Sequence, residues 1–480
     1  MKDLTAGKPL KIILTFTLSI FLGTIISLVH NITDTVIVGN FINADAFTGV
    51  GLTGSIIYFI SGFASGITAG FSVKIAQAFG AKDYSGMRQA IAMALYLTAI
   101  VSAILVAVFA PLSGTILRLM DTPEQNFGYA YYYLLITCCG IPVTMLGGLI
   151  IGALRATGDA RFPVVLTLIS VVANVAFDFL FILVFKMHYT GAALASKAAS
   201  LISIAVGFVY MRIHCPLLNL KLKDFKWRGE YIKQHLAIGL PMALQTSITG
   251  IGMMVQQAAL NGLSGTVHGA VTAYVAATKI DNIITSLFGA LGTAVATYAG
   301  QNSGAGRFDR VRQGVRAGLL LSVIFTAFGI AFNIGLGKPI MRLFVNPDKG
   351  GDAALYFDEI LSLGLKYLIF QCSFYWLLGI VNVLRNTLQG EGKSFIAMFA
   401  GLCEAAGRII ASLGFVKIWG FTGICVSNPA AWLFADVFFI SVYFTVLHIQ
   451  KKRTAKPSDA TAHETEPQPE ACVTQTEENK

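Results

Sequence analysis

Gln77-Ala78-Phe79-Gly80-Ala81 returns 224 residues later as Gln301-Asn302-Ser303-Gly304-Ala305. Further matching dipeptides lie at offsets of 224 and 232, namely Arg88-Gln89 with Arg312-Gln313, Thr190-Gly191 with Thr422-Gly423, and Gly158-Asp159 with Gly390-Glu391. The second half of the chain therefore restates the first. A repeat of this kind predicts two structurally similar halves.

The chain is apolar along most of its length, with 55% hydrophobic and only 12% charged residues among 480. Soluble domains usually carry about 25% charged residues. Apolar runs of about 20 residues are long enough to cross a bilayer. We expect twelve membrane-spanning helices, near residues 10–38, 51–79, 89–117, 128–154, 162–184, 191–211, 236–261, 270–300, 313–335, 356–384, 395–416 and 422–448.

Six of these helices fall in each half, so the sequence predicts an all-α integral membrane protein built from two pseudo-symmetric six-helix bundles. The expected N-lobe is 1–212 and the expected C-lobe is 236–448, joined by a basic linker, 213–235. An even number of helices gives both halves the same topology, as in parallel-repeat transporters. The polar and acidic tail, 449–480, has the composition of a disordered segment.

Lysine and arginine gather in alternate loops, which predicts the orientation. They are frequent at both termini and in the linker. The loops on the opposite side hold few of them, namely Arg118, Lys186, Lys338, Arg342, Lys349 and Lys417. By the positive-inside rule, both termini are expected in the cytoplasm. The net charge of +10 therefore reflects topology and anionic lipid, and we expect no nucleic-acid partner.

Six short motifs follow one another in a fixed order. They are Asp34 in the first helix, Gln77-Ala78-Phe79-Gly80-Ala81 after the second, Gly152-Ala153-Leu154-Arg155-Ala156-Thr157-Gly158-Asp159 after the fourth, Asn174-Val175-Ala176-Phe177-Asp178 in the fifth, Gly191-Ala192-Ala193-Leu194-Ala195-Ser196 in the sixth, and Ala299-Gly300-Gln301-Asn302-Ser303-Gly304-Ala305-Gly306 after the eighth. Together they resemble the multidrug and toxic compound extrusion (MATE) transporters of bacteria, over residues 5–450.

The resemblance implies an antiporter in the cell membrane that exports amphipathic, often cationic organic compounds or drugs by alternating access. The exchanged ion would be H⁺ or Na⁺. We expect small-molecule substrates, a bilayer environment, a monomer and no cofactor. An enzyme is not expected, because the sequence shows no nucleophile–base or metal constellation.

Ionisable side chains at bilayer depth are costly and usually face the protein interior. Asp34 lies in the first helix, and Asn174 and Asp178 are four residues apart on one face of the fifth. Such a group could share a proton or offer oxygens to Na⁺. The resemblance implies a coupling-ion site at Asp34, Asn174, Asp178 and Ser196, in which the first three would hold the ion if that ion is Na⁺. Alternatively, the aspartates could pair with a lysine and lock helices together, and the Ser196 hydroxyl could bond its own helix.

Lys197 departs from the family pattern. Its ammonium could reach one of the aspartates and occupy the space of a cation, or it could snorkel along its helix toward water. In the second half, Glu404 and Arg408 are four residues apart, which favours an ion pair, although Glu404 could also face a cavity. At the repeat offset Asp34 meets Ala258, so we expect the first half to bind the ion.

Substrate-contacting residues are harder to predict. Met253, Met254, Gln256, Gln257 and Tyr274 could line an adaptable surface, since methionine repacks around varied shapes. Each of them could equally be ordinary helix packing. The alternative function is a flippase of lipid-linked sugars from the same superfamily, which would be expected to have a more cationic cavity. Composition alone also allows a channel, but the duplicated halves favour alternating access.

Overall fold

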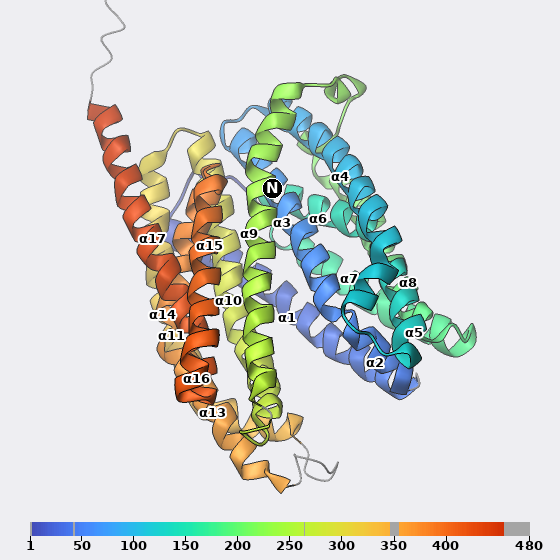
Figure 1. Ribbon diagram of the computed structural model, residues 1–480. Coiled ribbons are helices and arrows are strands. Elements are labelled where there is room, and N and C mark those ends of the chain that lie inside the picture. Colours follow the sequence, from blue (N-terminus) through green and yellow to red (C-terminus); the bar gives the residue numbers. More distant parts are fainter. Residues whose placement is uncertain (1, 42–43, 264, 346–354, 456–480) are drawn as a thin grey trace, which may run out of the picture. The chain divides into compact units, whose positions relative to one another are not determined.

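The computed structural model describes residues 2–41, 44–263, 265–345 and 355–455, and within these ranges the side chains at 32, 34–41, 44–47 and 443–455 lie outside the description. Over the described residues the chain is helical and contains no strand (Figure 1). The prediction of an all-α protein is confirmed.

The helices of the first half are α1 (Pro9–Phe41), α2 (Ala44–Leu52), α3 (Gly54–Gly80), α4 (Tyr84–Leu119), α5 (Glu124–Cys139), α6 (Ile141–Ala156), α7 (Phe162–Asp178) and α8 (His188–His214). Those of the second half are α9 (Gly229–Gly262), α10 (Ala270–Gly304), α11 (Phe308–Phe344), α13 (Phe357–Ser373), α14 (Tyr375–Gly390), α15 (Ser394–Ile410), α16 (Val416–Trp419) and α17 (Phe421–Ala455). Ten spans and two bent helix pairs give the twelve predicted crossings, so the chain is a multi-pass membrane protein.

The same irregularities recur in both halves. The fourth span is bent by 44° between α5 and α6, and its counterpart by 49° between α13 and α14. Pro142 begins α6, where its missing N–H and fixed φ suit a helix start. The fifth span carries a π-helical stretch in each half, η1 (Phe179–Val184) and η5 (Ala411–Phe415). The repeat seen in the sequence is therefore a repeat of backbone geometry.

The boundaries differ from the sequence prediction at the linker and the tail. Between α8 and α9 only two short 3₁₀ turns remain, η2 (Pro216–Leu218) and η3 (Leu222–Phe225), so the first turns of α9 occupy part of the predicted linker. Similarly, α17 continues past the predicted end at 448 to Ala455. Hydropathy does not register helix ends that are polar. The rest of the predicted tail, 456–480, lies outside the described residues.

Each half has a hydrophobic core of its own. The first is built chiefly from α3, α4, α5 and α6, with Phe71, Met87 and Leu149 among its buried side chains. The second is built from α9, α10, α11 and α13 together with Phe421, Ile424 and Cys425. The first cluster also reaches Ala243 of α9, but each cluster is centred in its own half, as two six-helix bundles require.

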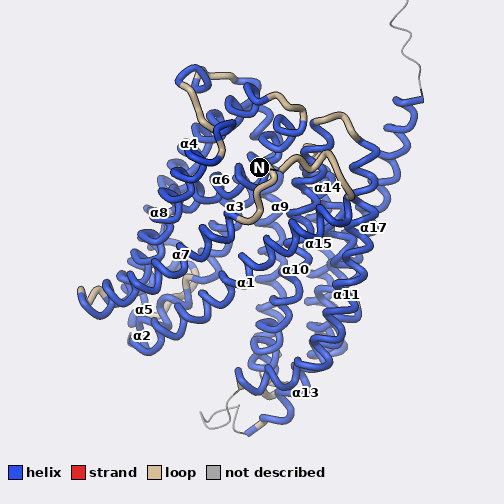
Figure 2. The backbone as a smooth tube through the Cα atoms, turned by 180° about the vertical axis from the view of Figure 1, so that it is seen from behind, coloured by secondary structure: helices blue, strands red, loops and turns tan. Residues whose placement is uncertain are grey.

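The two bundles meet most closely where α3 runs beside α9 (Figures 1 and 2). Gly62, Gly66 and Gly70 recur every fourth residue on α3. A Cβ on Gly66 would lie 2.7 Å from the Cα of Ala243, and one on Gly70 would overlap the backbone of Gly239. Small residues at this spacing let helix backbones approach closely in a membrane.

The repeated motif itself forms a second contact between the bundles. A Cβ on Gly80 would overlap the Gln301 carbonyl, and a Cβ on Gly304 would overlap the Gln77 carbonyl. Gln77 Nε2 donates to the carbonyl of Gly390 at 3.0 Å, and Gln301 Nε2 donates to the carbonyl of Ala156 at 2.8 Å. Each glutamine thus caps the end of the fourth span in the opposite bundle. We call Gln77–Gly80 and Gln301–Gly304 the seam.

The amino-terminal segment lies across the seam, between the bundles (Figure 2). The Leu4 amide donates to Gln301 Oε1 at 2.9 Å, and the Thr5 carbonyl accepts from Arg307 Nη1 at 2.6 Å. On the other side, the Lys2 amide donates to the Thr157 carbonyl at 3.0 Å. Leu4 is buried. The segment therefore holds both bundles together at this end.

The structure changes the residue alignment of the two halves at the turn that follows the fourth span. Gly158 and Gly392 both have φ of 82°, and both close a Schellman motif at the end of a helix. The sequence similarity had aligned Gly158 with Gly390 instead. The left-handed backbone, which glycine adopts without strain, decides that Gly392 is the counterpart.

Candidate functional site

Three of the four predicted coupling residues lie together inside the first bundle. Asn174 and Asp178 come from α7 and are 1% and 0% exposed. Ser196 comes from α8, which packs against α7. The π-helical stretch η1 begins directly after Asp178, and such irregular turns are frequent at functional sites.

Asn174 is the centre of the hydrogen bonding. In the amide orientation that satisfies its neighbours, Nδ2 donates to Asp178 Oδ2 and to His30 Nε2, both at 3.2 Å, and Oδ1 accepts from the Ser196 amide at 3.1 Å. The Ser196 hydroxyl donates to the Ala192 carbonyl of its own helix at 3.3 Å. The sequence analysis had named a bond between the Ser196 hydroxyl and its own helix as an alternative to ion binding, and the structure contains this bond.

His30 of α1 was missed at the sequence level. Its imidazole reaches the Asn174 amide, and its Nδ1 has no hydrogen-bond partner among the described residues. The available indication was its spacing, since it is an ionisable residue four positions before Asp34 on the same helix. The backbone of Asp34 belongs to α1, but its side chain lies outside the described residues.

Chemically, the cluster combines a buried carboxyl group, an amide, a hydroxyl and an imidazole. A buried carboxylate favours binding a proton or a cation, because a negative charge is costly to hold away from water. Among the described residues no group of three His, Cys, Asp or Glu side chains is arranged to hold a metal ion. The oxygen atoms of a carboxylate, an amide and a hydroxyl are ligands that suit a proton or a hard cation.

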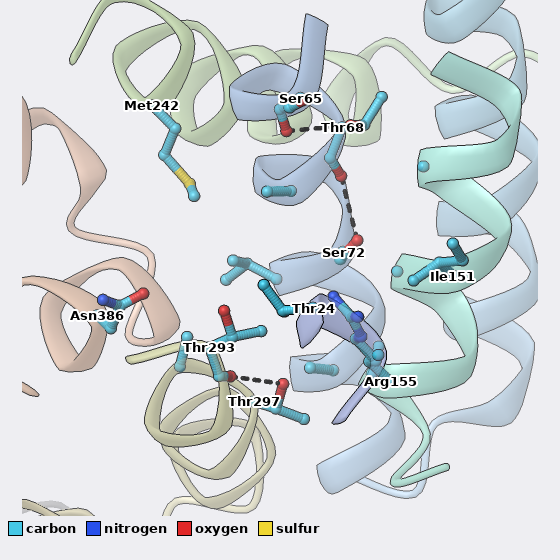
Figure 3. Close-up of a pocket in the computed structure, with 18 of the residues that line it drawn as sticks. Thr24, Ser65, Thr68, Ser72, Ile151, Arg155, Met242, Thr293, Thr297 and Asn386 are labelled. Carbon is cyan, nitrogen blue, oxygen red and sulfur yellow. Dashed lines mark hydrogen bonds between the residues drawn. The ribbon is translucent and has the colours of Figure 1, made fainter. Parts of the chain in front are cut away.

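A cavity of about 480 Å³ lies between the bundles. It is bounded by α1, α3, α6 and α7 on one side and by α9, α10 and α14 on the other. Its wall is made mainly of short side chains, including Thr24, Thr68, Ser72, Thr293 and Thr297 (Figure 3). The volume is within the range of about 300–1,000 Å³ that is typical of small-molecule sites.

A sequence model of the MatE family matches the chain over residues 19–180 and 241–412, once in each half. The chain belongs to the MatE family. The probable multidrug resistance protein YpnP of Bacillus subtilis (strain 168) is 31% identical over 392 residues, which are 81% of this chain and 84% of that protein. An FAD transporter of Shewanella oneidensis is 23% identical, over 82% and 85% of the two chains.

Solved structures agree on the fold of this MATE transporter. One described as an outward-facing conformation of a multidrug resistance MATE family transporter superposes with a TM-score of 0.84 at 18% identity, covering 94% of this chain and 99% of that one. The predicted family, the two six-helix bundles and the absence of enzymatic activity agree with these likenesses. The chain is an efflux transporter of the MATE family that acts on small molecules from within the membrane.

The side chain of Lys197 in this transporter contacts α6. Its ammonium donates to Thr144 Oγ1 on α6 at 3.2 Å. Its aliphatic stem passes directly over Gly140, where a Cβ would overlap it. No ion pair joins Lys197 to an acid among the described residues. The side chain of Asp34 lies outside the described residues, so both sequence-level alternatives for Lys197 stay predictions.

We expect Lys197→Met to transport normally. The substitution removes an ammonium whose described partner is a neutral hydroxyl, so gradient-driven efflux from proteoliposomes should stay within about twofold of wild type. Lys366→Met is the matched control, because that ammonium also donates to a threonine, Thr422 Oγ1, at 2.6 Å. A change in the driving ion in Lys197→Met alone would instead connect Lys197 to the coupling site.

Glu404 and Arg408 form the predicted ion pair on α15, with Arg408 Nη2 at 3.3 Å from Glu404 Oε1. Sequence reasoning missed Arg385 of α14, whose Nη2 lies 2.8 Å from Glu404 Oε2. Glu404 and Arg408 are both buried. The carboxylate thus joins two helices of the second bundle.

The five residues proposed for substrate contact do not line the described cavity. Gln256 is buried and its amide lies 3.5 Å from the Ile424 carbonyl, whereas Gln257 bonds Asn261 at 2.9 Å on its own helix. Met253 and Met254 are about half exposed, and Tyr274 packs edge-on against Tyr367. Short side chains line the cavity because only they leave space between closely packed helices.

Proposed function

We propose that this transporter is an antiporter that couples the entry of H⁺ or Na⁺ to the export of amphipathic organic compounds by alternating access. The observation that carries the proposal is the buried Asp178–Asn174 pair beside Ser196 and His30 in the first bundle. When a buried carboxyl group gains or loses a cation, its charge changes, and the packing of its helix changes with it.

The proposed coupling site comprises Asp34, Asn174, Asp178 and Ser196. Helical spacing places position 34 one turn after His30, whose imidazole contacts Asn174. Binding of the ion lowers the cost of burying the carboxyl groups and biases α1, α7 and α8 toward one arrangement. Substrate must favour the other arrangement, since exchange requires that the two ligands differ in their preference.

The distribution of lysine and arginine supports a cytoplasmic position for both termini in the cell membrane. In this orientation the seam and the amino-terminal segment close the cytoplasmic end of the protein. Each inward charge then contributes about 2.3 kcal/mol per 100 mV of membrane potential. We propose the N-lobe as 1–212 and the C-lobe as 236–448, in a monomer. The relatives do not favour the alternative of a lipid-linked sugar flippase.

The test is dye efflux from proteoliposomes under an imposed pH gradient or an imposed Na⁺ gradient. We expect one gradient to drive efflux in wild type. We expect Asp34→Asn and Asp178→Asn to reduce it to background, because an amide takes up no proton near neutral pH and lacks the negative charge of a carboxylate. Asp436→Asn is the matched control, since Asp436 is an equally buried acid in the second bundle.

Retained coupling in Asp436→Asn would assign energisation to the first bundle. Undiminished gradient-driven efflux in both Asp34→Asn and Asp178→Asn would contradict the proposal that these two aspartates bind the coupling ion. Running each gradient alone also identifies the ion.

A further inference from the structure

We infer that the cavity between the bundles binds the anionic group of an organic molecule through Arg155. This inference rests on the proposed function, because it names the chemistry of the molecule that the same cavity carries. Its basis is the charge of the cavity wall. Among the described residues that line it, Arg155 is the single ionisable side chain, and no acid accompanies it.

Arg155 lies in the last turn of α6. Its guanidinium points from α6 toward Ser72 and Thr24 (Figure 3). Its Nε is fully buried and has no hydrogen-bond partner among the described residues. No carboxylate among the described residues lies within ion-pair distance of its guanidinium. The arginine is thus not a member of an ion pair within this part of the structure.

An uncompensated guanidinium in such a place is unusual. Arg155 is half-buried. Moving an isolated charge even partly out of water is costly, and such charges are normally paired. Other arginines in this protein follow that rule: Arg88 lies 3.2 Å from Asp224, and both Arg385 and Arg408 reach Glu404. Arg155 instead presents its planar set of N–H donors to the cavity, and this geometry suits a carboxylate, sulfonate or phosphate.

The remaining wall indicates what is attached to that anionic group. Apolar surface comes from Val73, Ile151 and Met242, on three different helices. Hydroxyls surround it, among them Thr24 and Ser72, whose protons are now directed to carbonyls of their own helices. A hydroxyl can rotate its proton toward a ligand. The wall therefore fits an amphipathic molecule with one anionic end.

The position of Arg155 also places it next to the seam. The carbonyl of the following residue, Ala156, accepts the hydrogen bond from Gln301 that closes this end. When the seam opens, Arg155 is at the entrance from that side. An anion bound to Arg155 would therefore lie beside the hydrogen bond between Gln301 and Ala156, at the end of the cavity where we expect a substrate to enter.

The experiment measures binding without any gradient, so that its result is independent of ion coupling. Purified full-length protein in phosphatidylcholine nanodiscs is titrated into two xanthene dyes of similar size, anionic fluorescein and cationic rhodamine 6G, with fluorescence anisotropy as the readout. We expect wild type to bind fluorescein at least about tenfold more tightly. Equal or tighter binding of rhodamine 6G by wild type would overturn the inference.

Two variants test the residue itself. Arg155→Gln should weaken fluorescein binding about 10- to 100-fold and leave rhodamine 6G unchanged, whereas Arg155→Lys should keep the preference for the anion with reduced affinity. Arg161→Gln is the control, because Arg161 is an exposed arginine six residues further along. Equal losses for both dyes in Arg155→Gln, with a folded protein by size-exclusion chromatography, would contradict the assignment.

The same chemistry could come from a soluble organic anion or from an anionic lipid head group. Repeating the titration with phosphatidylglycerol added to the nanodiscs separates these sources. Competition by the lipid assigns the site to a head group, and unchanged fluorescein binding assigns it to a soluble anion. Either result supports an anion site. A failure of coupling in the Asp178→Asn experiment would leave this binding result intact.

Discussion

Gly304→Leu is expected to abolish transport by preventing the seam from closing. A side chain at this position would overlap the carbonyl of Gln77, which is main chain in the opposite bundle. Because no rotamer change relieves an overlap with backbone, the bundles must separate at this end. Overpacking costs about 1–3 kcal/mol even where neighbours can move, and about 5.5 kcal/mol is enough to invert a 99:1 equilibrium. Gradient-driven efflux should fall at least about tenfold.

The structural readout is the distance across the seam. Spin labels at positions 82 and 309, which are both exposed, report it by pulsed electron resonance in a variant whose native cysteines are replaced by serine. We expect a short, narrow distance distribution in the parent and a longer one in Gly304→Leu. Gly289→Leu is the matched control, because Gly289 lies on the same helix and has no atom within 4 Å of an added Cβ. An unchanged distribution in Gly304→Leu would contradict the closing role of the seam.

The sequence predicted the scaffold because scaffold features are local. Hydropathy predicted twelve spans, and the repeat predicted two equivalent halves. The motif around Gln77 and Gln301 was recognised only as a turn, however. The reciprocal contact forms because the carboxyl-terminal ends of α3 and α10 pack against each other. Neither segment alone indicates that they are neighbours.

In the candidate site, the sequence predicted only those contacts that join residues of the same helix. The spacing of Asn174 and Asp178 placed them on one face, and that of Glu404 and Arg408 predicted their ion pair. His30 and Arg385 escaped prediction because each comes from another helix. Partners across helices depend on packing, which periodicity within one helix does not contain.

Glu404→Gln is expected to be the most destabilising substitution in the second bundle. Glutamine keeps the volume of glutamate but removes its charge, so the guanidinium groups of Arg385 and Arg408 both lose the carboxylate that they share. Arg408 is 2% exposed, and its other contacts are the neutral Asn428 Oδ1 at 3.2 Å and the Thr249 carbonyl at 3.5 Å. Breaking a buried ion pair by removing one partner costs about 3–5 kcal/mol. The melting temperature in detergent should fall by several degrees.

Asp309→Asn is the control for this prediction. Asp309 pairs with Arg312 three residues along one helix, but its side chain is 83% exposed. Exposed pairs contribute about 0–1 kcal/mol, so the melting temperature of this variant should stay close to that of wild type. If Glu404→Gln melts within one degree of Asp309→Asn, the buried cluster does not depend on the charge of Glu404.

A second variant, at Asp436 of α17, tests the same ion-pair cluster. It is 2% exposed, neither carboxyl oxygen has a hydrogen-bond partner among the described residues, and Arg385 and Glu404 are the charged groups that act on it. When Glu404 loses its charge, Asp436 is the remaining acid near Arg385 and can compensate part of the loss. The double variant Glu404→Gln/Asp436→Asn should therefore lose more stability than its two single variants together, as a double-mutant cycle measures. Strict additivity would show that the second bundle holds one ion pair and a separate carboxyl group.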